Sequence, residues 1–110
     1  MTYTIFPLKV IRNGEIVKTV NYPTFAAADK FIYKMDKDAE TVGYNMYAGT
    51  TPFITRYNAK TNTIYTTTET PATKVESILA HANLLNEKDR ENYLKRAIAL
   101  GDITINDLNN

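Results

Sequence analysis

The chain has 110 residues, with 13 basic and 12 acidic side chains, a formal net charge of +1 and no cysteine. Its length suits one domain with a single hydrophobic core. The balanced charge argues against a strong non-specific nucleic-acid binder or a membrane-surface protein, because these usually carry a clear basic excess. The lack of cysteine excludes disulfides, thiolate metal sites and thiol catalysis.

The sequence gives no sign of a targeting or membrane segment. No basic region follows Met1, and no run of about 20 apolar residues is present. We therefore expect a cytoplasmic protein.

The first third of the chain predicts a β-hairpin. Residues 2–12 and 15–21 are rich in β-branched and aromatic side chains, and Asn13-Gly14 separates them. Asn-Gly between two such runs is a strong hairpin signal, because a type I′ turn needs positive φ at both central residues. A two-residue turn would pair Arg12 with Glu15, Ile11 with Ile16 and Val10 with Val17.

Pro7 lies inside the first of these runs. Proline has no amide hydrogen to donate to a β-ladder, so it is confined to edge strands and bulges. We therefore expect a sheet edge or a bulge at this position.

A helix is predicted over residues 25–38. Thr24 is a good N-cap residue. The apolar residues then recur at helical spacing, while the lysines lie elsewhere on the helix. The helix should pack on the sheet with one apolar face, formed by Phe25, Ala28, Phe31, Ile32 and Met35.

Three more strands are predicted, over 41–48, 53–57 and 63–68, with loops at 49–52 and 59–62. A four-residue first loop would place Ala48 opposite Phe53. Alternation then predicts two faces. The expected core side contains Val42, Tyr44, Met46, Phe53, Thr55, Tyr57 and Ile64. The opposite side contains Tyr47, Ile54, Arg56, Tyr65 and Thr67.

Two helices are predicted at the C-terminal end. Thr73 and Glu76 have the spacing of a capping box, and Asn86 begins a second helix that Gly101 ends. Ile103, Ile105 and Leu108 in the tail predict that it docks on the protein. This helical hairpin could cover the face that carries Tyr47, Arg56 and Tyr65, or leave it free.

No motif in the sequence defines a catalytic or metal site. His81 is the only histidine and Ser77 the only serine, four residues apart on one predicted helix. A hydrolase using His81 is conceivable, but no oxyanion loop or Gly-rich elbow accompanies the pair. We expect no catalytic residue, no metal and no cofactor.

The sequence as a whole predicts an α+β domain with a mainly antiparallel sheet of about five strands and helices packed on it. The element order is β-β-α-β-β-β-α-α. One domain, 1–110, would contain a hairpin plus helix (1–40), a three-strand meander (41–69), and a helical hairpin with its tail (70–110).

The leading functional prediction is a small non-catalytic module that binds another protein. Tyr and Arg are common interface anchors, so the tentative binding residues are Tyr47, Ile54, Arg56 and Tyr65. Abundant Asn, Thr and Tyr are typical of many small bacterial, phage or mobile-element proteins, so an inhibitor or accessory factor of such a system is expected. Self-association through a sheet edge is a further option.

The alternative is a single-stranded nucleic-acid binder whose Tyr/Arg sheet face stacks on bases. This hypothesis uses Tyr47, Arg56 and Tyr65 for stacking, with basic residues along an edge, namely Lys9, Lys18 and Lys60. The balanced charge and the lack of an RRM-like aromatic signature count against it.

Overall fold

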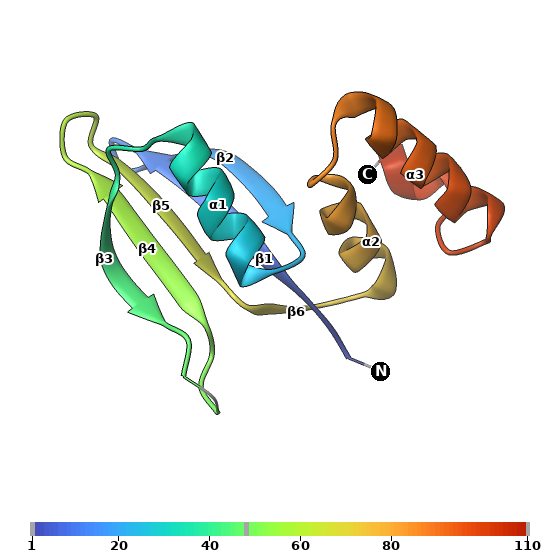
Figure 1. Cartoon of the computed structure of the whole chain (residues 1–110), viewed down its shortest axis with the longest axis horizontal. Helices are drawn as coiled ribbons and strands as arrows, with labels where there is room; N and C mark the ends of the chain where they lie inside the picture. The colour runs from blue at the N-terminus through green and yellow to red at the C-terminus, as the bar shows by residue number, and fades with distance from the viewer. Residues whose placement is uncertain (1, 48, 110) are drawn as a thin grey trace.

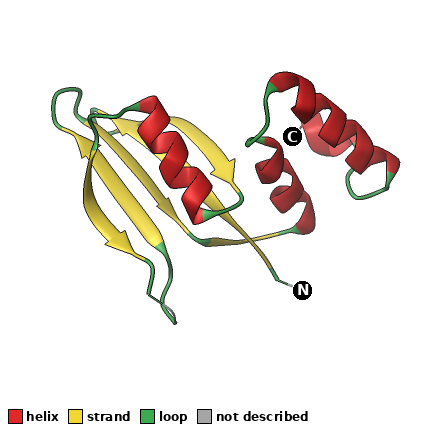
Figure 2. Cartoon of the chain, viewed as in Figure 1, coloured by secondary structure: helices red, strands yellow, loops and turns green. Residues whose placement is uncertain are grey.

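The protein is an α+β domain in this computed structural model, which describes residues 2–47 and 49–109. The element order confirms the prediction, and Figures 1 and 2 show the arrangement. A short sixth strand, which is absent from the predicted order, lies in the segment 70–72. The elements are β1 (Tyr3–Arg12), β2 (Glu15–Tyr22), α1 (Phe25–Met35), β3 (Glu40–Asn45), β4 (Phe53–Asn58), β5 (Thr63–Thr68), β6 (Thr70–Ala72), α2 (Lys74–Ala82), α3 (Glu87–Ala99) and the 3₁₀ turn η1 (Ile105–Asn109).

The sheet is antiparallel throughout, in the order β2-β1-β5-β4-β3, and β6 pairs with the N-terminal end of β1. The first hairpin turns at Asn13 and Gly14, whose φ values are 52° and 82°. The predicted pairs Arg12–Glu15 and Ile11–Ile16 are confirmed. The third predicted pair is wrong, because Val17 lies in a β-bulge and Val10 pairs with Lys18 instead.

The sequence predicted a sheet edge or a bulge at Pro7, and the edge is wrong, because β1 has neighbours on both sides. The proline instead lies where one ladder is interrupted: β1 pairs with β5 from Lys9 onward and with β6 up to Ile5. By this register, Pro7 faces Thr68 and has no N–H to donate to its carbonyl. The hydroxyl of Thr70 donates to that carbonyl at 2.9 Å in its place.

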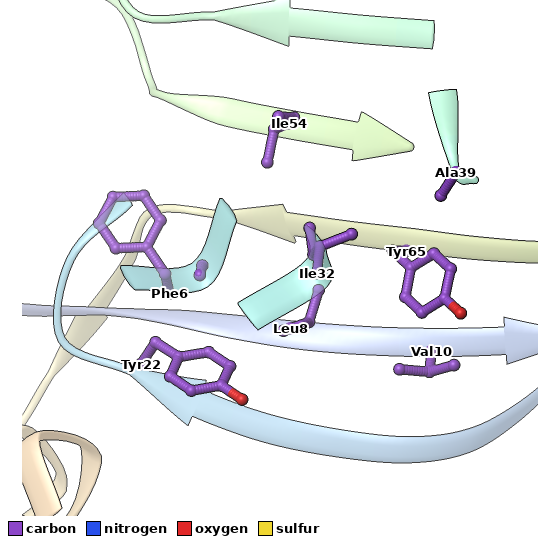
Figure 3. Close-up of a cluster of buried hydrophobic side chains, with 9 residues drawn as sticks. Phe6, Leu8, Val10, Tyr22, Ile32, Ala39, Ile54 and Tyr65 are labelled. Atoms are coloured by element: carbon purple, nitrogen blue, oxygen red, sulfur yellow. The ribbon is translucent and has the colours of Figure 1, made fainter. Parts of the chain in front are cut away.

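The core lies between the sheet and α1. Thr24 caps this helix as predicted, accepting a hydrogen bond from the Ala27 amide at 3.1 Å. Ala28 and Ile32 are fully buried against the strands, and the Phe31 ring stacks on Tyr22 with 4.8 Å between ring centroids. Figure 3 shows the large buried side chains, namely Phe6, Leu8, Val10, Tyr22, Ile32, Ile54 and Tyr65. Burial of one side chain of this size contributes about 1.5–3 kcal/mol.

The predicted faces of β4 and β5 are inverted, whereas Tyr44 of β3 lies on the α1 side as predicted, paired with Ile54 and in contact with the Phe25 ring. Ile54 and Tyr65 belong to the core, whereas Val42, Tyr44 and Met46 are exposed. Two features shift the register from the prediction. Residues 46–52 form a longer connection than four residues, so Phe53 pairs with Asn45, and a bulge lies at Val42. Ala48, the predicted partner of Phe53, is outside the described residues.

The last hairpin of the meander has the predicted register. Tyr57 pairs with Ile64 and Asn58 with Thr63, which leaves 59–62 as the turn. Tyr57 and Ile64 therefore share a face, as predicted. That face is the one opposite α1, because Tyr65, the neighbour of Ile64, points into the core.

The C-terminal helices lie beside the end of the sheet (Figure 1). α2 contacts β1 and β2, and α3 packs on α2. The capping box at Thr73 and Glu76 is present with bonds of 3.1 and 3.0 Å, and Gly101 follows α3 with a φ of 78°. Ile103 is 2% exposed, so the tail docks at that residue as predicted. The prediction is wrong for Ile105 and Leu108, which are exposed.

Membrane insertion through a helix finds no support in residues 2–47 and 49–109. None of the helices there is both long enough and apolar enough to cross a bilayer.

Candidate functional site: the uncovered face of the sheet

The four residues predicted to bind a partner do not form one surface. Ile54 is 2% exposed and Tyr65 is 4% exposed, both in the core beneath α1. Arg56 lies on the same side of β4 and forms an ion pair with Asp29 of α1. Tyr47 is 79% exposed in the connection between β3 and β4. A partner could reach Ile54 and Tyr65 only if α1 moved away.

The Arg56–Asp29 contact fastens α1 to β4. Arg56 Nη2 and Nε lie 2.9 and 3.0 Å from Asp29 Oδ1, and Nη1 donates to the Ala39 carbonyl at 3.4 Å. The guanidinium is therefore committed to positioning the helix.

A second polar contact fastens the C-terminal end of α1. The Asp36 carboxylate accepts two bonds from Asn58 Nδ2, at 2.8 and 3.0 Å, and one from the Tyr65 hydroxyl at 3.0 Å. The Asn58 hydrogen bond is the main cause that lowers the pKa of Asp36. Burial, and then the Asp36 hydrogen bond, raise the pKa of Tyr65. This network holds Tyr65 inside the fold.

His81 and Ser77 show no catalytic geometry. The His81 ring is exposed and lies 5.1 Å from the Tyr93 ring, in a tilted contact. Within the described part of the chain, no hydrogen bond joins His81 to Ser77, and no three metal-ligating side chains are grouped.

The face of the sheet opposite α1 carries no helix in the described part of the chain. Among the described helices, α1 is the only one whose outline overlaps the five-stranded part of the sheet in Figure 1, and it lies on the near side. We call the far side the open face. Alternation along the paired strands assigns its residues to three cross-strand rows. In the order β2, β1, β5, β4, β3, these rows are Ile16–Ile11–Ile64–Tyr57–Glu40, Thr19–Lys9–Thr66–Thr55–Gly43, and Asn21–Pro7–Thr68–Phe53–Asn45.

The first of these rows is unexpectedly apolar. An antiparallel sheet with one solvated face normally alternates apolar residues inward and polar residues outward. Here Ile16, Ile11, Ile64 and Tyr57 lie side by side on the outward face of four adjacent strands. Ile16 is 60% exposed, and the other three are half-buried by their neighbours. We call these four residues the apolar row; contiguous exposed apolar surface of this kind commonly marks an interaction site.

The second and third rows are polar, and a crevice opens between them. It has a volume of about 250 Å³ and lies at the interrupted ladder between β1 and β5. Lys9, Thr66, Thr68 and Pro7 are among the residues that line it. In the described ranges, 2–47 and 49–109, the ion pairs do not include Lys9. The crevice therefore offers one ammonium group and neighbouring hydroxyl groups to a ligand.

Sequence reasoning missed the apolar row, although a signal for it was present. Val10-Ile11 and Ile16-Val17 each place two apolar residues in succession, so both faces of the hairpin had to be apolar. Strands that are covered on both faces typically have apolar residues in succession, as here.

Comparison with models of protein families, with curated proteins and with solved structures finds no match. The residues of the open face are therefore the basis of the functional proposal.

Proposed function

We propose that this protein is a non-catalytic binding module that docks another protein on the open face of its sheet. The observation that carries the proposal is the apolar row, which spans four strands on a face that no helix of the described residues covers. Burying Ile11, Ile16 and Ile64 beneath a partner would remove apolar surface from water, at about 25 cal/mol per Å².

The charge of the open face favours a protein partner over a nucleic acid. Lys9 and Glu40 are the charged residues of its three rows, and their charges cancel. A nucleic-acid surface usually neutralises several phosphates with several cations. Tyr57 and Phe53 could stack on bases, but one lysine gives little hold on the backbone. Of the three residues that first favoured single-strand binding, Tyr65 is buried and Arg56 is ion-paired. The third, Tyr47, is exposed but lies outside the sheet, in the β3–β4 connection.

In this proposal the protein works by occupying or recruiting its partner, as an inhibitor or accessory factor in the cytoplasm of a bacterial, phage or mobile-element system. In this proposal, α1 keeps the sheet rigid from one side, and the open face on the other side contacts the partner.

The test compares three immobilised proteins in a lysate of the source organism. The first is the native chain. The second is the double variant Ile11→Thr/Ile64→Thr, which makes the apolar row polar but keeps β-branched residues in the strands. The third is the matched control Val17→Thr/Val42→Thr, which makes the same change at exposed bulge residues outside the apolar row. Equal melting temperatures establish that all three are folded.

The proposal expects proteins that bind to the native chain and to the control but not to the apolar-row variant. Retention of the same proteins by all three would contradict it. Salt-sensitive retention of nuclease-sensitive oligonucleotides, in place of protein, would establish the nucleic-acid alternative.

A further inference from the structure

The partner's contact segment can be described from the layout of the open face, on the premise that the proposed function is right. The central strands β1 and β5 carry Ile11 and Ile64 side by side. Lys9 and Thr66 lie two residues further along these strands, and they are also paired. One further step away, the ladder is interrupted between Pro7 and Thr68. An apolar contact, a cation and a crevice therefore follow one another in a line along two adjacent strands.

Strand addition at the sheet edges does not suit this layout. The two strands that end the five-stranded order each contain a bulge, at Val17 in β2 and at Val42 in β3. A bulge interrupts the regular row of outward backbone groups that an added strand would need. The partner must therefore approach the face, where the side chains lie.

A helix fits the spacing of these contacts. Two residues along a strand span about 6.7 Å. One helical turn, from residue i to residue i+4, rises about 6 Å. A helix aligned with β1 and β5 would then place successive turns over Ile11–Ile64, over Lys9–Thr66 and over the crevice. The opposite face of the same sheet already packs against a helix, because α1 contacts β1, β2 and β4.

The charge of Lys9 on β1 indicates which polar group the partner should carry. Lys9 is exposed, forms no ion pair within residues 2–47 and 49–109, and lies beside Thr66 on the open face. Thr66 is in turn hydrogen-bonded to Thr55 through their hydroxyls at 2.9 Å. Covering Lys9 with an apolar segment would leave a desolvated charge without a partner, which is unfavourable. A carboxylate one helical turn from an aliphatic anchor would satisfy it.

We propose that the open face binds an amphipathic helix of another protein, with an aliphatic residue over Ile11 and Ile64 and an Asp or Glu one turn away opposite Lys9. The carboxylate accepts a hydrogen bond from the Lys9 ammonium at the mouth of the crevice. Reversing the charge of Lys9 should therefore reverse the charge that the face selects.

The experiment uses a displayed library of 18-residue helical peptides, randomised along one face and selected against the full-length protein. The native chain is expected to enrich peptides with an acidic residue four positions from an aliphatic one. The variant Lys9→Glu is expected to enrich Lys or Arg at that position. Enriched peptides are then resynthesised and titrated by fluorescence anisotropy.

In the titrations, Lys9→Gln should weaken binding of the acidic peptides by roughly tenfold, the size of a lost hydrogen bond to a charged group. The control Lys60→Glu changes an exposed lysine in the β4–β5 turn and should leave affinity unchanged. Ile11→Thr/Ile64→Thr should abolish binding, with melting temperatures reported for every variant.

The possible failures separate the two proposals. Peptides that need Ile11 and Ile64 but show no charge preference would overturn the Lys9–carboxylate pairing and leave the proposed function standing. If no helical peptide is enriched while a lysate protein still depends on the apolar row, the helix itself is overturned. If neither assay depends on the apolar row, both proposals fail.

Discussion

The two lobes of this molecule are built from different kinds of core. The sheet and α1 bury large side chains, with Leu8, Ile32 and Ile54 among the most enclosed. In the C-terminal lobe of α2, α3 and η1, the buried apolar residues are three alanines and Ile103. Stabilisation grows with the apolar area removed from water, so the sheet lobe should hold most of the folding free energy. The C-terminal lobe should open locally at lower free energy.

The strongest test of this comparison is Leu8→Ala. Leu8 is fully buried at the centre of the sheet, so the variant should lose about 4 kcal/mol of unfolding free energy. Urea denaturation followed by circular dichroism measures the loss, and the whole chain should unfold together. The exposed residue Val17, changed to Ala, serves as the control. A loss below 1 kcal/mol would mean that the sheet core is not the main source of stability.

Asp36→Ala tests the polar attachment of α1 to the sheet. It should cost about 3 kcal/mol, because the buried donors of Asn58 and Tyr65 would lose their acceptor. The measurement is the urea midpoint at pH 7. Asp38→Ala is the control, because Asp38 is an exposed neighbour. Equal effects of the two variants would show that the network adds nothing.

Protonation of the Asp36 carboxylate should lower the stability of the sheet lobe in acid. The pKa of Asp36 is lowered in the folded state, chiefly by the Asn58 hydrogen bond. Its contribution to stability is therefore complete above the unfolded pKa of about 3.9 and is lost as the pH falls through the folded pKa. Urea midpoints between pH 6 and pH 2.5 should fall less steeply for Asp36→Ala than for the native chain.

Ile103→Ala tests the weaker lobe. The loss should be about 2 kcal/mol, at the lower end for this truncation, because a small core can collapse around the gap. Amide hydrogen exchange should speed up in α2 and α3 and stay unchanged in β1, β4 and β5. Ile105→Ala, at an exposed position, is the control. Faster exchange across the whole sheet would show that the two lobes form one cooperative unit.

The smallest expected effect is a gain of stability from Thr67→Val. Thr67 Oγ1 is buried, and in the described part of the chain it is the one buried side-chain polar atom with no hydrogen-bond partner. Replacing it with a methyl group should add about 1 kcal/mol. Thr66→Val is the control, since it breaks the hydroxyl contact with Thr55. A destabilised Thr67→Val variant would mean that the hydroxyl is satisfied in solution.

Local signals in the sequence predicted the elements well. The Asn13-Gly14 turn, the Thr24 cap and the Thr73–Glu76 capping box each depend on residues within a few positions of one another. Such signals fix where an element begins or turns, whatever the rest of the chain does.

The faces of the meander could not be predicted in the same way. Arg56 and Asn58 read as solvent-facing residues, yet they point toward α1 because Asp29 and Asp36 on that segment bind them. These partners are more than twenty residues away, so no local pattern reveals them. The same error affected the candidate site. Because the core side was predicted wrongly, the buried residue Tyr65 was assigned to the binding surface in place of Ile64.

The position of β1 has a consequence for how the chain could be divided. A cut in the exposed connection between β3 and β4 would leave one piece with β1, β2, α1 and β3, and another with β4, β5, β6 and the C-terminal helices. The two pieces interleave, because β1 of the first pairs with β5 and β6 of the second, and β3 pairs with β4. Neither piece holds the complete sheet, so each would regain it only by finding the other. The protein is thus suited to being expressed as two complementing fragments whose association rebuilds the open face.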